Sequence, residues 1–123
     1  MKVLSLKQPY AELILQGKKK IELRKWNTHF RGEFLIHSSL TPDKIAMRKF
    51  GFNELPLGFV VGKANIVDVK KYDNDIDFFK DKNLHLANKS FGGFGFLLED
   101  VGRTELIPVK GQLNFWNFQG NFE

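Results

Sequence analysis

The sequence predicts an α+β fold, with many strands in a curled sheet or small barrel and two short helices. Several segments alternate apolar and polar residues, two segments have helical spacing with recognisable ends, and glycines interrupt the longest strand segments. A chain of 123 residues, of which 42% are hydrophobic, can build one modest core. We therefore predict a single domain spanning residues 1–123.

The first predicted elements are a strand at Val3–Leu6 and a helix at Pro9–Gln16. An apolar stripe with i, i+3 and i+4 spacing begins at Tyr10, so one face of this helix should be buried. Gly17 can adopt a positive φ without a steric penalty and is typical of the residue that ends a helix.

The segment after this helix predicts a strand at Ile21–Lys25 with two different faces. Side chains alternate along a strand, so Ile21 and Leu23 should face the core. The opposite face would carry Lys20, Glu22, Arg24 and Trp26. An acid, two bases and an indole on one face could form a site, or only a solvated surface with salt bridges.

The middle of the chain predicts a strand, a helix and a longer strand. A turn at Arg31–Gly32 leads into the strand Phe34–His37. Thr41 and Pro42 have the residue types of an N-cap and a first helical position, and Gly51 would end that helix. The strand Phe59–Val69 follows, with a bulge or bend expected at Gly62.

The last third of the chain predicts a loop followed by strands. Residues 73–88 mix acidic and basic side chains, which indicates a loop with one short helix at most. We predict strands at Phe94–Leu98 and Leu113–Phe118, with a turn at Gly102–Arg103 between them.

Composition restricts the classes of function. The net charge is +5, which favours a polyanionic partner. The chain has no cysteine, and its three histidines do not have metal-binding spacing, so we predict no metal or other cofactor. No apolar run approaches the ~18 residues of a membrane span, and the N-terminus does not resemble a signal peptide. We therefore expect a cytoplasmic protein with no membrane partner.

Four segments together resemble the ASCH domain family, a branch of the PUA-like β-barrels. The first is the motif Gly17-x-Lys19-x-x-Glu22-x-Arg24. The others are Leu4-Ser5-Leu6-x-Gln8-Pro9-Tyr10-Ala11, Ile36-His37-Ser38-Ser39, and Ile107-Pro108-Val109-Lys110-Gly111-Gln112 followed by Phe115-Trp116. The resemblance covers nearly the whole chain. It implies a small closed barrel of about six strands, two or three short helices, and a cleft beside the motif.

The resemblance also implies a role in binding RNA or a modified nucleotide. Lys19 and Arg24 would contact phosphate or a base edge, and Glu22 would orient Arg24. Tyr10 or Trp26 could stack on a base, although core packing is an equal alternative for Trp26. The complete set of expected ligand-binding residues is Gln8, Tyr10, Lys19, Glu22, Arg24, Trp26, His37, Ser38, Ser39 and Lys110.

Two other functions stay open at this point. Some family members are hydrolases, namely an acetylcytidine amidohydrolase and a ribonuclease, so Lys19 and Glu22 could be catalytic. The amidohydrolase, however, has a threonine nucleophile three residues after the motif lysine, where this chain has Glu22. In the third alternative, the motif is a structural ion-pair network in a protein-interaction barrel, with partners that the sequence does not identify.

Overall fold

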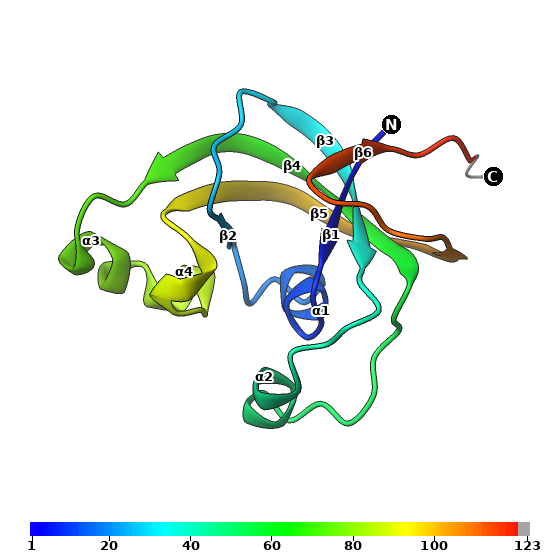
Figure 1. Ribbon diagram of the computed structural model, residues 1–123, viewed down its shortest axis with the longest axis horizontal. Helices are drawn as coiled ribbons and strands as arrows, with labels where there is room; N and C mark the ends of the chain where they lie inside the picture. The colour runs from blue at the N-terminus through cyan, green and yellow to red at the C-terminus, as the bar shows by residue number, and fades with distance from the viewer. Residues whose placement is uncertain (121–123) are drawn as a thin grey trace.

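The computed structural model describes residues 1–120, which form one six-stranded sheet with short helices around it (Figure 1). The strand order is β2-β5-β4-β3-β1-β6. Only the pair β1–β3 is parallel, and the other neighbours are antiparallel. The strands are β1 (Lys2–Leu6), β2 (Ile21–Arg24), β3 (Gly32–Ser38), β4 (Phe59–Lys71), β5 (Phe94–Pro108) and β6 (Phe115–Asn117). The predicted domain of residues 1–123 extends three residues beyond the described part.

The sheet is curled, and β4 and β5 run through it as long curved ribbons (Figure 1). Within residues 1–120, β2 pairs with β5 alone and β6 pairs with β1 alone. The α+β class and the six strands are therefore confirmed, whereas closure of the barrel by strand pairing is not. Aromatic rings occupy the space between the two edges, with Trp26 and Phe115 at 5.6 Å between ring centroids.

In residues 1–120, four short α-helices and one 3₁₀ turn lie around the sheet, which is more than the two or three expected. The helices are α1 (Tyr10–Leu15), α2 (Lys44–Lys49), α3 (Asp75–Lys80) and α4 (Lys82–His85), and the 3₁₀ turn is Lys89–Phe91. The apolar stripe of α1 is buried as predicted, and Gly17 follows it at φ +77°. No helix of the described residues is long and apolar enough to cross a membrane.

Three local predictions are wrong. The predicted turn at Gly102–Arg103 lies inside β5, where both residues pair with β4 and register shifts lie on either side of them. The second helix begins after Asp43, whose carboxylate accepts a hydrogen bond from the Ala46 amide, so Thr41 and Pro42 precede it. Residues 73–88 hold two helices, because the buried Phe78 anchors the segment to the core.

Buried side chains pack in several clusters, two of which fix the position of β2. Leu4, Ile14, Phe34 and Phe96 are all fully buried in one cluster between α1 and the strands. Ile21 and Leu23 are buried in a second cluster with Phe78, as their alternation predicts. These contacts place the other face of β2, with Glu22 and Arg24, toward the open edge of the sheet.

Candidate functional site

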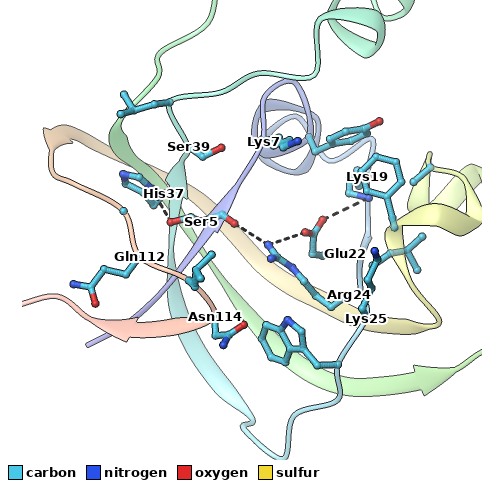
Figure 2. A pocket seen from close by; sticks show the side chains of 18 of the residues that line it. Ser5, Lys7, Lys19, Glu22, Arg24, Lys25, His37, Ser39, Gln112 and Asn114 are labelled. Carbon is cyan, nitrogen blue, oxygen red and sulfur yellow. Dashed lines mark hydrogen bonds and ion pairs between the residues drawn. The ribbon is translucent and has the colours of Figure 1, made fainter.

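A cavity of about 800 Å³ lies beside β2, at the edge where strand pairing does not close the barrel. Its walls come from β1, β2, β3, the segment around Phe91 and residues 110–114. Figure 2 shows Lys19, Glu22 and Arg24 on one side of it and Ser5, His37 and Gln112 on the other. The motif therefore forms part of a real pocket rather than a flat surface.

Eight of the ten expected ligand-binding residues line this cavity. They are Tyr10, Lys19, Glu22, Arg24, Trp26, His37, Ser39 and Lys110. Gln8 does not line it, because its amide bonds the backbone of Glu12 and Pro56. Ser38 is fully buried and exchanges hydrogen bonds with the backbone of Phe59. The structure thus gives these two residues structural contacts.

The carboxylate of Glu22 lies between the two motif cations. Its Oε2 atom is 3.0 Å from Nη2 of Arg24, and its Oε1 atom is 3.7 Å from Nζ of Lys19. Glu22 is 8% exposed, so the water around it is limited and the pairing is stronger than on a surface. Glu22 therefore orients Arg24, as expected from the sequence.

Lys19 is almost completely buried and has polar partners inside the protein. Its Nζ atom donates to the carbonyl oxygen of His85 and lies 5.2 Å from the ring centre of Tyr10. Burial lowers the pKa of Lys19, and the negative charge of Glu22 opposes that shift. The lysine expected to meet a ligand as a point charge is thus held mainly by protein groups.

Arg24 lines the cavity, and one of its donors has no hydrogen-bond partner among the described residues. Its Nη2 atom donates to the carbonyl oxygen of Ser5 at 2.8 Å. Its guanidinium carbon lies 6.0 Å from the Trp26 ring centre. Among the described residues, Nε of Arg24 is the one buried side-chain nitrogen or oxygen without a hydrogen-bond partner. An unsatisfied buried donor is costly and needs an acceptor, which a ligand in the cavity can supply.

The two aromatic candidates have different surroundings. Tyr10 donates its hydroxyl to Asp43 at 3.3 Å, and burial together with that carboxylate raises its pKa above the ordinary value. Trp26 packs edge-to-face on Phe96 and Phe115 and also lines the cavity. Trp26 therefore packs on the core, as one of its two alternatives expects, and its place in the cavity wall leaves base stacking a prediction.

His37 lies at the far end of the cavity, and both of its ring nitrogens are bonded. Nε2 is 2.8 Å from the carbonyl oxygen of Val109, and Nδ1 is 2.9 Å from Oγ of Ser5. A carbonyl can only accept, so Nε2 carries the proton and Nδ1 accepts from the serine hydroxyl. Burial lowers the pKa of His37, which keeps the imidazole neutral.

Sequence reasoning missed several residues of the pocket. They are Ser5, Lys7, Ser90, Phe91, Gly111, Gln112 and Asn114. Ser5 and Gly111 stand inside segments used for the family resemblance, so those segments held the signal. Ser90 and Phe91 lie between the predicted loop 73–88 and the predicted strand Phe94–Leu98, and no local pattern connects them with β2.

The lysines just before and just after β2 divide between the cavity and the solvent. Lys19 and Lys25 line the cavity, whereas Lys18 and Lys20 are exposed outside it. In residues 1–120, no group of three His, Asp or Glu side chains is placed to hold a metal ion. The cavity lining offers charged groups, hydrogen-bonding groups and aromatic rings.

Comparison with known proteins places this arrangement in a known family. The ASCH domain family model matches residues 4–101. Activating signal cointegrator 1 from Homo sapiens, and its counterpart from Mus musculus, are each 23% identical over 92% of this chain. The chain spans 21% of the length of those relatives. A crystal structure of ASCH from Zymomonas mobilis superposes with a TM-score of 0.63 at 19% identity, over 87% of this chain and 72% of that one.

Proposed function

The chain belongs to the ASCH domain family, and from this premise we propose that it is a binding module for RNA or a modified nucleotide. The ligand would lie in the cavity beside β2. The observation that carries the proposal is the guanidinium of Arg24, which lines the cavity and whose buried Nε has no acceptor among the described residues. A phosphate oxygen or a base carbonyl oxygen would pair with this guanidinium.

The charge of the cavity supports an anionic ligand. Its charged lining consists of one carboxylate, Glu22, and the cations Lys7, Lys19, Arg24, Lys25 and Lys110. Three of these cations, Lys7, Lys25 and Lys110, are exposed. Exposed cations around a pocket attract a polyanion over a distance of about 8–10 Å at ordinary salt. Phosphate groups of a nucleic acid fit this rim.

Ring surfaces in the same cavity support a base. Trp26, Tyr10 and Phe91 all line it. Stacking of a base on an aromatic side chain contributes about 1–3 kcal/mol, and every nucleic-acid base can stack in this way. Glu22 could accept from an exocyclic amine, although Arg24 already holds one of its oxygens.

The hydrolase alternative based on Lys19 and Glu22 has weaker support. A catalytic lysine must reach a reacting atom, but Lys19 is 2% exposed and donates to the His85 carbonyl. Glu22 is paired with both cations. This trio is better suited to presenting Arg24 than to transferring protons.

The test is titration of the protein with short single-stranded RNA and with a nucleoside 5′-monophosphate. Arg24→Ala should weaken binding by about 1.5–3 kcal/mol, which is typical of a hydrogen bond to a charged group. Arg48→Ala is the matched control, because Arg48 is exposed on α2 and does not line the cavity. Equal affinity of both variants and the parent protein would overturn the proposal.

A further inference from the structure

We infer that Ser5 and His37 form a nucleophile and general base that transfer the acyl group of a small carboxylic ester to water. The inference goes beyond ligand binding, although it uses the same cavity, whose lining includes both residues. It is distinct from the hydrolase alternative above, which relies on Lys19 and Glu22.

The distances suit a nucleophile and its base. Oγ of Ser5 is 2.9 Å from Nδ1 of His37, within the range expected for a serine hydroxyl activated by an imidazole. The two residues are paired across β1 and β3, so regular sheet geometry holds them together. A base on a strand is positioned more rigidly than one on a loop.

A third group fixes the orientation of the base. The Val109 carbonyl oxygen accepts the Nε2 proton of His37 at 2.8 Å. That bond leaves the lone pair of Nδ1 directed at the serine hydroxyl. Trp116 lies edge-to-face with the imidazole, at 5.6 Å between ring centroids, and further limits its rotation.

Two neighbours bear directly on the serine oxygen. The indole Nε1 of Trp116 lies 3.3 Å from Oγ and can only donate, so the serine hydroxyl keeps its own proton directed at Nδ1 of His37. A Cβ added to Gly111 would be 2.8 Å from Oγ and 2.6 Å from Cε1 of His37. Only a residue without a side chain lets the 110–114 segment approach the pair this closely.

The proposed step is an ordinary acyl transfer. Oγ of Ser5 attacks the ester carbonyl carbon while its proton moves to Nδ1 of His37. The carbon–oxygen bond to the leaving alcohol then breaks, and His37 returns the proton to that alcohol. Water then attacks the acyl-serine and loses a proton to His37. The carboxylic acid is released, and His37 returns the proton to Oγ of Ser5.

The surroundings select an ester that carries an anionic group. Arg24 donates to the backbone carbonyl oxygen of Ser5, so its guanidinium contacts the residue that carries the nucleophile. This guanidinium lines the cavity and can pair with a carboxylate or phosphate group of the substrate. The cavity, about 800 Å³, accommodates a compact ligand. We assign small anionic carboxylic esters as the substrate class.

The experiment is labelling of the full chain with a small alkyl fluorophosphonate, followed by intact mass and peptide mapping. The serine oxygen displaces fluoride from phosphorus, so an activated serine keeps a stable adduct. We expect one adduct, on Ser5. His37→Gln should slow its formation at least about 100-fold, the usual contribution of a general base. Ser5→Ala should abolish it, and Thr104→Ala, a hydroxyl of β5 outside the cavity, should not change it.

The labelling result stands apart from the test of RNA binding. No adduct on the folded parent protein, an adduct elsewhere, or an unchanged rate in His37→Gln would overturn the inference. Mapping on the parent protein needs no variant, so a poorly folded Ser5→Ala protein would not obscure the result. Labelling without RNA binding would refute the proposed ligand alone, and binding without labelling would refute the serine–histidine pair alone.

Discussion

Arg24 on β2 donates a hydrogen bond of 2.8 Å to the carbonyl oxygen of Ser5 on β1. These strands are not neighbours in the sheet, since β2 pairs with β5 and β1 pairs with β3 and β6. The bond therefore crosses the edge that strand pairing leaves open. The Arg24 side chain thus connects the two sides of the sheet and also lines the cavity between them.

Arg24→Ala should consequently weaken the fold as well as ligand binding. The Ser5 carbonyl would lose its charged donor, and Glu22 would keep only Lys19, at 3.7 Å. We expect the free energy of unfolding to fall by about 1.5–3 kcal/mol, measured by urea denaturation. Arg48→Ala should change it by less than about 0.5 kcal/mol, as usual for a surface substitution. Equal stability of Arg24→Ala and the parent would mean that this bond does not hold the open edge.

The local part of the fold was predictable because it depends on short-range periodicity. Alternation placed Ile21 and Leu23 in the core, and the φ of +77° at Gly17 matches its expected position after a helix. The family resemblance added the strand count and the motif. These signals involve neighbours within a few residues, so one sequence contains them fully.

The remaining features depend on contacts between distant residues. The buried Lys19 donates a hydrogen bond to the His85 carbonyl, 66 residues away. The pair of Ser5 and His37 meets only through the parallel pairing of β1 and β3. Phe78, inside the charged stretch of residues 73–88, is buried against the core and anchors its two helices. No local pattern encodes such contacts.

Acid should destabilise the protein through two buried histidines. Burial lowers the pKa of both His37 and His85 from their ordinary value of 6.5, and the charges of Lys19 and Lys82 add to the effect at His85. In acid the unfolded chain therefore binds more protons than the folded chain. The stability that the neutral histidines contribute is fully present above about pH 6.5 and is lost as the pH falls from there toward their lowered pKa values in the folded protein. Urea denaturation between about pH 7 and 5 should show this decline.

Variants at the histidines check that assignment. The decline in unfolding free energy with acid should be shallower in His37→Gln and in His85→Gln than in the parent. His29→Gln is the matched control, because His29 is exposed and should leave the slope unchanged. If both variants keep the slope of the parent protein, groups other than these two histidines cause the acid sensitivity.

Gly111→Ala should disturb the cavity without affecting backbone preference. Its Cβ would meet Ser5 Oγ at 2.8 Å and His37 Cε1 at 2.6 Å, so the 110–114 segment must move. We expect a loss of about 1–3 kcal/mol in unfolding free energy, typical of overpacking, and weaker ligand binding. Gly102→Ala is the control, since its Cβ would have nothing nearer than 3.8 Å. Similar melting temperatures for the two variants would contradict the close approach of this segment.

Salt dependence should separate cations that face the cavity from those that only solubilise the protein. If about three to five cations contact RNA phosphates, log K should fall against log salt with a slope of roughly −2 to −3.5. Lys25→Ala should reduce that slope by about 0.7, the effect of one lost contact with a single strand. Lys20→Ala removes the same charge five residues away, from an exposed position outside the cavity, and should leave the slope unchanged. Equal slopes for both variants, or a flat slope in the parent, would show that the charge of the cavity does not bind phosphate.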